Sequence, residues 1–152
     1  MTQQRWFAAA LLLVACGGGS PAPTQPATSA AGAVQGFMKA VADSNLARMA
    51  SLWGTASGPA SETHQPPDWQ RRIAIMQAYL RNDSFRLTSD VPGPDQNRRE
   101  LQVEIRRQTC TWSVPFVAVN SNRGWLVTQV DIAAAGNPAR PCEPGADTAS
   151  GG

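Results

Sequence analysis

The chain has 152 residues, which suits one domain rather than several. It carries 13 Lys and Arg against 11 Asp and Glu, and its arginines are scattered, mostly in pairs, instead of forming a basic run. This balance excludes proteins that bind nucleic acid through a strongly basic groove, so we expect no nucleic-acid partner.

The first 15 residues have the order of an export signal. A polar start with one positive charge, Arg5, is followed by an unbroken apolar run over 6–15. Ten helical residues span about 15 Å, half of a bilayer core of roughly 30 Å, so the run is too short to cross a membrane. A Gly-, Ser- and Pro-rich segment follows and cannot supply a core, which argues against a buried helix. We interpret 1–15 as a signal peptide.

The end of this signal, Leu13-Val14-Ala15-Cys16, resembles the lipobox of bacterial lipoprotein precursors. In that family the cysteine receives a diacylglyceryl group on sulfur, the signal is cut before it, and its new amine is acylated. The resemblance implies lipidation of Cys16 and a chain held in the bacterial envelope by its lipid. Gly17, rather than Asp, follows the cysteine, which implies the outer membrane, facing the periplasm.

Residues 17–31 are predicted to form a flexible tether between this anchor and the folded part. Glycine, serine and proline dominate the segment, and it has too little apolar content to fold alone. Fifteen such residues have a root-mean-square reach of roughly 20 Å. The domain predicted over 32–132 would therefore stay close to the membrane and remain free to reorient.

Three helices are expected at the start of that domain, because apolar residues recur at the spacing of one helix face. Asp43 or Ser44 can cap the second helix and Gly54 can end it, whereas Asp68 can cap the third. Residues 55–67 contain three prolines and are predicted to be a loop. The inner faces comprise Val34, Phe37, Met38 and Val41, then Leu46, Met49, Ala50 and Trp53, then Trp69, Ile73, Met76 and Leu80.

Four strands are expected after residue 84, where the apolar period changes from three or four residues to two. The segment 92–97 and the segment 120–124 have the composition of turns. Residues 133–152 are small, polar and Pro-rich and are predicted to be a loose tail. The apolar positions are Phe85, Leu87 and Val91, then Leu101, Val103 and Ile105, then Cys110, Trp112, Val114 and Phe116, then Leu126, Val130 and Ile132.

Helices followed by an antiparallel meander make an α+β fold, with three N-terminal helices packed on a curved four-stranded sheet. The order resembles the nuclear-transport-factor-2-like cone, which includes ketosteroid isomerase and SnoaL-like proteins. The run over 37–43, the segment over 46–54 and the closing strand over 125–130 carry the resemblance. Many members have a strand or hairpin between the second and third helices, and the predicted loop over 55–67 departs from that pattern.

With Cys16 assigned to lipid, Cys110 and Cys142 remain. Two such thiols outside the cytoplasm commonly form a disulfide, which here would pin the C-terminal tail to the strand that carries Cys110. A buried free Cys110 with an exposed Cys142 is the alternative. One histidine and two distant cysteines do not form a metal-ligand cluster, so we expect neither a metal nor another cofactor.

Enzymes that resemble this cone use acid–base residues inside its cavity, and four side chains could serve here. His64 lies in a polar loop and Asp43 is better explained as a cap, whereas Tyr79 packs near a helix end. Asp131 faces either the cavity or solvent. We find no nucleophile motif, phosphate loop or paired-carboxylate spacing, so no catalytic residue is assigned.

The tryptophans occupy periodic apolar positions, so core packing is the first interpretation and a ligand pocket the second. If a pocket exists, we expect it between the sheet and the third helix, lined by Tyr79, Trp112, Phe116 and Asp131. The function that fits best is a non-catalytic accessory module that binds an envelope protein or a small apolar ligand. A small acid–base enzyme and a structural subunit of an envelope assembly are the alternatives.

Overall fold

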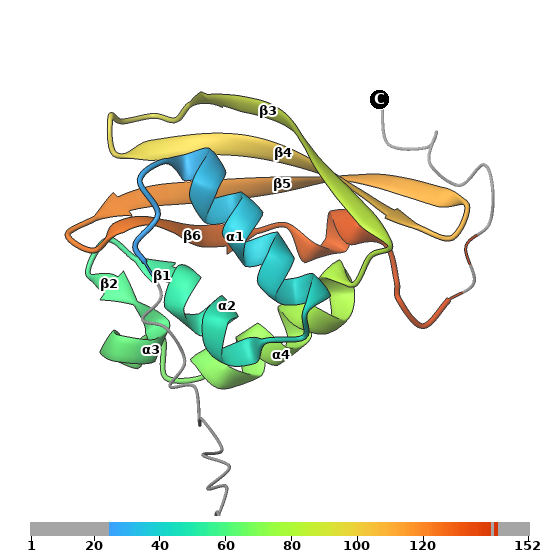
Figure 1. Ribbon diagram of the computed structural model, residues 1–152, viewed down its shortest axis with the longest axis horizontal. Coiled ribbons are helices and arrows are strands. Elements are labelled where there is room, and N and C mark those ends of the chain that lie inside the picture. The colour runs from blue at the N-terminus through green and yellow to red at the C-terminus, as the bar shows by residue number, and fades with distance from the viewer. Residues whose placement is uncertain (1–24, 141, 143–152) are drawn as a thin grey trace, which may run out of the picture.

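The structure, a computed structural model, describes residues 25–140 and Cys142; the signal peptide, Cys16 and the first part of the predicted tether lie outside them. Helices precede the large sheet in the chain (Figure 1). The helices are α1 (Ala30–Ala42), α2 (Leu46–Leu52), α3 (Ala60–Thr63) and α4 (Trp69–Leu80), with a final 3-10 turn η1 (Ile132–Ala135). The strands are β1 (Gly54–Thr55), β2 (Gly58–Pro59), β3 (Ser84–Pro92), β4 (Arg98–Arg107), β5 (Cys110–Ser121) and β6 (Gly124–Val130).

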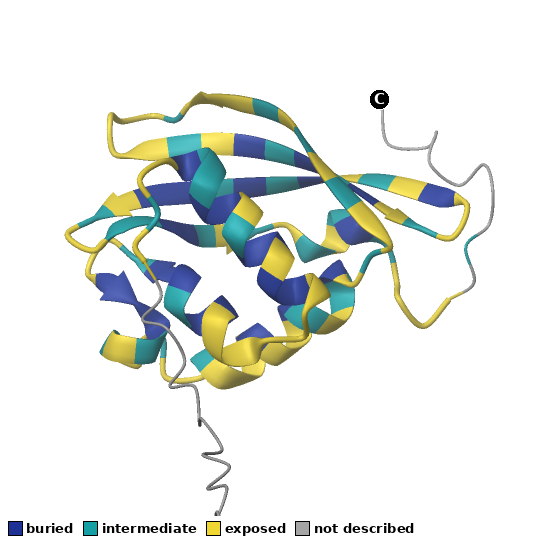
Figure 2. Cartoon of the chain, viewed as in Figure 1, coloured by how far each residue is buried: buried dark blue, intermediate teal, exposed yellow. Residues whose placement is uncertain are grey.

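The large sheet is an antiparallel meander in the order β3-β4-β5-β6, and it curves over the helices, as Figure 1 shows. In β4, Leu101, Val103 and Ile105 are buried and alternate with more exposed polar residues (Figure 2). On the other face, Arg86 pairs with Glu104 at 2.9 Å. One apolar and one solvated face are what an antiparallel sheet covered on one side requires. The predicted α+β class is confirmed.

Helix α1 provides the middle of the core. The Ser29 hydroxyl accepts a hydrogen bond from the Gly32 amide at 3.0 Å and so caps the helix. Phe37 is fully buried, and its ring meets that of Phe116 edge-on with the centroids 6.4 Å apart.

The folded part begins before residue 32, because the Trp125 amide donates to the Ala27 carbonyl at 2.9 Å. The last residues of the predicted tether therefore belong to the domain.

The segment between α2 and α4 is not a plain loop, contrary to the expectation for 55–67. It contains the β1–β2 hairpin and the single turn α3. A Cβ on Gly54 would collide with the carbonyl oxygen of Gly58, so the close approach of the two strands requires glycine. Strands of two residues are too short to show an alternating pattern, so they could not be predicted from the sequence. The expected departure at this position was therefore wrong, because a hairpin does lie between α2 and α4.

The caps of α2 and α4 also differ from expectation. Asn45, not Asp43 or Ser44, caps α2 and accepts from the Arg48 amide at 2.9 Å; Asp43 instead ends α1. Asp68 stands at the N-cap position of α4, but its carboxylate bonds the Arg72 guanidinium at 2.9 Å rather than a backbone amide. This hydrogen bond holds the pKa of Asp68 below its ordinary value.

A β-bulge changes the face presented by β6. The register shifts between Val117 and Ala118, so Val127 lies opposite Ala118 and joins the core. Leu126, expected on the inner face, is buried opposite Val119 instead.

Among the described residues, we find no helix with the length and apolar character needed to cross a membrane.

Candidate functional site

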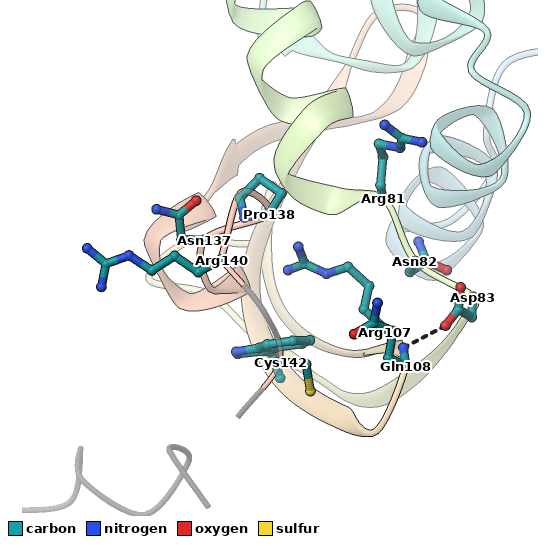
Figure 3. A pocket seen from close by; sticks show the side chains of 10 residues that line it. Arg81, Asn82, Asp83, Arg107, Gln108, Asn137, Pro138, Arg140 and Cys142 are labelled. Atoms are coloured by element: carbon teal, nitrogen blue, oxygen red, sulfur yellow. Dashed lines mark hydrogen bonds between the residues drawn. The ribbon is translucent and has the colours of Figure 1, made fainter. Parts of the chain in front are cut away.

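A hollow of about 420 Å³ lies at the end of the molecule where the C-terminal segment returns to the sheet. Three parts of the chain line it: the α4–β3 junction, the β4–β5 turn with the start of β5, and the segment before Cys142. Figure 3 shows Arg107 in its middle, with Arg81 on one side and Arg140 on another. We call it the arginine hollow. Its lining residues are Arg81, Asn82, Asp83, Arg107, Gln108, Trp112, Asn137, Pro138, Arg140 and Cys142.

The C-terminal segment is held at this hollow by several contacts. Cys110 and Cys142 form a disulfide with their Cα atoms 5.8 Å apart, which confirms the predicted pair. Ala135 of η1 is fully buried, and its carbonyl accepts a hydrogen bond from the Arg107 guanidinium. Through Ala135, therefore, the predicted loose tail is part of the folded domain.

Arg107 is the most constrained charge of the hollow. Its guanidinium lies 4.4 Å from the centroid of the Trp112 ring, a cation–π arrangement. Burial lowers the pKa of Arg107, whereas the negative charge of Asp83 raises it. Arginine remains protonated at neutral pH despite such burial, so a cation is fixed here. Its buried Nε has no hydrogen-bond partner among the described residues.

Some of the other polar side chains that line the hollow form hydrogen bonds, and others have no ion-pair partner among the described residues. The Asp83 carboxylate accepts from the Gln108 amide at 2.7 Å, and the Asn82 side chain donates to the Leu80 carbonyl at 2.8 Å. Arg81 and Arg140 are exposed. Within residues 25–140 and Cys142, neither forms an ion pair. The hollow therefore presents cations that the described part of the chain does not neutralise.

The residues of the predicted pocket do not gather at one site. Trp112 lines the arginine hollow, but Phe116 is 1% exposed and packs on α1, so it offers almost no surface to a pocket. Tyr79 is half-buried on α4. Asp131 is exposed and its carboxylate accepts from the Ala133 amide at 3.2 Å, which starts η1. These four residues therefore do not line a common cavity, and the hollow that does lie between α4 and the sheet is lined by other residues.

The four acid–base candidates also lie on different elements. Asp43 ends α1, Tyr79 is in α4, and His64 is exposed after α3, where its ring centroid is 6.2 Å from that of Trp69. Among the described residues, no hydrogen bond joins any of these side chains to another candidate. In the same part of the chain, no group of three or more His, Cys, Asp or Glu could hold a metal ion.

A second hollow, of about 410 Å³, lies between α4 and β6 and is more apolar. The charged residue that lines this hollow, Arg72, already forms an ion pair with Asp68 at 2.9 Å. Trp53 and Met76 are almost fully buried, whereas Ile75 is partly exposed. This groove has no uncompensated charge that requires a ligand, in contrast to the arginine hollow. Its remaining lining residues are Thr128, Gln129, Val130 and Ile132.

The three arginines of the hollow were not predicted from the sequence, where they look like scattered surface charges. A usable signal was present in their positions relative to the cysteines. Arg107 stands close before Cys110 and Arg140 close before Cys142. Any disulfide between those cysteines must bring both arginines to the same end of the molecule. Arg81 has no such marker, since only the fold brings the end of α4 there.

No protein-family model matches the chain, and no curated protein matches it. Among solved structures, the chain is similar to a proposed dehydratase of the NTF2-like family from Streptomyces avermitilis. The identity is 16%, the match covers 63% of this chain and 86% of the other, and the TM-score is 0.43. This is a distant structural likeness to a member of the nuclear-transport-factor-2-like (NTF2-like) family, and the α+β description rests on this chain's own helices and sheet.

Proposed function

We propose that this protein is a lipid-anchored envelope lipoprotein whose folded domain binds a small molecule, or a group on a partner protein, at the arginine hollow without transforming it. The observation that carries the proposal is the fixed Arg107–Trp112 pair, set between two further arginines in a walled hollow. A concave site with a few convergent polar groups around an aromatic ring is typical of ligand binding.

Lipid attachment at Cys16 is supported by the Leu13-Val14-Ala15-Cys16 motif and by the apolar run before it. Two or three acyl chains on one residue hold a protein at a membrane far more firmly than a single chain. The described fold begins near Ala27, so about ten residues separate it from the anchor. A disulfide that closes the hollow also suits an oxidising compartment outside the cytoplasm.

A binding role accounts for the hollow better than acid–base catalysis does. Arginine is a poor proton donor or acceptor near neutral pH, because its pKa is far above that range. The one carboxylate of the lining, Asp83, already accepts the Gln108 amide. The assembly alternative has less support, because the large apolar side chains that are most exposed, Leu46, Ile75 and Val91, lie on three different elements.

Native mass spectrometry of the detergent-extracted protein tests the binding role. We expect the wild-type protein to retain a bound small molecule or partner that the Arg107→Met variant releases. Met keeps much of the side-chain volume and removes the charge. If the wild-type protein carries nothing, or if both forms retain the same species, the hollow is not its binding site.

The Cys16→Ser variant tests the anchor separately. We expect it to lose acylation and to move to the soluble fraction, since serine cannot form the thioether. Ser20→Ala, a small change in the same segment, should remain acylated and membrane-bound. A Cys16→Ser protein that is still acylated and sediments with membranes contradicts the lipoprotein assignment. The measurement combines fractionation with the intact mass.

A further inference from the structure

The charge of the arginine hollow is unusual within this protein. Three arginines and one aspartate give its lining a net charge of +2, equal to the formal charge of the whole 152-residue chain. Of the eight other arginines in the described residues, three (Arg48, Arg71 and Arg106) form no ion pair and five form ion pairs with carboxylates at 2.7–3.5 Å: Arg72, Arg86, Arg98, Arg99 and Arg123. The three arginines of the hollow have no such partner there.

Cations that share a small concave surface repel one another, and a partly buried site screens that repulsion less than open water does. An anion in the hollow relieves the repulsion. Its oxygens also match the planar fork of guanidinium donors, which binds carboxylate and phosphate through paired hydrogen bonds.

We propose that the arginine hollow binds a small organic anion whose carboxylate or phosphate group is held by Arg107 together with Arg140 and Arg81. The inference rests on the proposed binding function and names the chemical class of its ligand. The volume of about 420 Å³ falls in the range of about 300–1,000 Å³ that small-molecule sites occupy.

The three arginines have different parts in this site. Arg107 is held in place by the Ala135 carbonyl and the Trp112 ring, so it is ordered before the ligand arrives. In Figure 3 the side chains of Arg81 and Arg140 point away from Arg107. Both are exposed and free of ion pairs within the described residues, so they can turn inward to contact the anion. Arg140 reaches the hollow because Cys142, two positions later, is bonded to Cys110. The disulfide is therefore a structural part of the site.

Three ring compounds that differ chiefly in charge test the inference: benzoate, phenyl phosphate and benzamide. Each is titrated into the full-length processed protein in a non-ionic detergent, with the indole N–H resonances followed by NMR. Both anions should shift the Trp112 resonance in a saturable way. Benzamide, which has the same ring without the charge, should bind at least tenfold more weakly. Anion binding should weaken as salt is raised, because the attraction is electrostatic.

Variants separate a specific site from general surface charge. Arg140→Gln, at an exposed position, should weaken anion binding several-fold without unfolding the protein. Arg71→Gln removes an exposed arginine of α4 outside the hollow and should leave binding unchanged.

Equal binding of benzoate and benzamide, or no saturable shift of Trp112 with either anion, overturns the anion assignment. An equal loss of binding in Arg71→Gln and Arg140→Gln does so too. None of these results depends on the retained species sought by native mass spectrometry, so the binding function can survive the loss of this inference.

Discussion

Trp112 shows how one side chain can serve both the core and the hollow. Its ring lies under the Arg107 guanidinium and also packs against the core cluster. Gly136, immediately after η1, reaches the ring edge so closely that a Cβ there would lie 2.6 Å from the indole Nε1. Gly136 also has a φ of 69° and a ψ of 175°, a combination that is essentially restricted to glycine. Close contact and backbone conformation together require glycine at this position.

The Gly136→Ala substitution should therefore destabilise the protein by about 1–3 kcal/mol, the usual cost of a backbone conformation that is essentially restricted to glycine. Displacement of Trp112 adds to this cost. The measurement is the free energy of unfolding in urea. Gly36→Ala, in α1, is the control, because its Cβ would meet only the end of the Leu52 side chain at 3.2 Å. If Gly136→Ala is as stable as the control, the backbone does not approach Trp112 as described.

Among the elements, the long helices and strands were predictable and their ends were not. Helix α4 spans Trp69–Leu80 with Ile73, Met76 and Leu80 buried, as the apolar spacing indicated. The predicted capping residue of α2 was wrong. Asp43, Ser44 and Asn45 are all good capping residues, and the sequence alone does not rank them. Ser44 adopts a φ of 52° at the end of α1, which leaves Asn45 to begin the next helix.

Asn45→Ala tests this assignment of the cap. Loss of the hydrogen bond from the Arg48 amide should lower the free energy of unfolding by about 1 kcal/mol, within the usual range of about 0.5–2 kcal/mol. Asp43→Ala is the control, because its side chain caps neither helix in the structure. Chemical denaturation of the two variants distinguishes them. A larger loss in Asp43→Ala than in Asn45→Ala would show that the cap was misplaced.

At the scale of the whole molecule, one covalent bond connects the last part of the chain to the sheet. The Cys110–Cys142 disulfide closes a loop of 32 residues and holds the segment that contributes Asn137, Pro138 and Arg140 to the hollow. A disulfide that closes a loop of this length lowers the entropy of the unfolded chain. In the chain-entropy model this stabilises the folded state by about 3–4 kcal/mol.

The paired variant Cys110→Ser with Cys142→Ser should lower the free energy of unfolding by about 3 kcal/mol. A reductant should shift the urea midpoint of the wild-type protein in the same direction. The paired variant itself serves as the control, since a reductant has no disulfide to cleave there and should leave its midpoint unchanged. Two titratable thiols in the oxidised wild-type protein at these positions would contradict the bond.

The sequence by itself determined the α+β class and the main helices and strands, and it favoured the Cys110–Cys142 pair, which the tertiary structure then established. These depend on periodic burial and on residue counts, which are local properties of the chain. The tertiary structure alone revealed the arginine hollow and the β1–β2 hairpin, and it placed Phe116 in the core rather than in a pocket. The hairpin was missed because its two-residue strands are too short to show a pattern, whereas the hollow and the burial of Phe116 depend on which distant segments meet. Arg81, Arg107 and Arg140 lie far apart in the chain and become neighbours only when α4, the β4–β5 turn and the disulfide-linked segment pack at one end of the sheet.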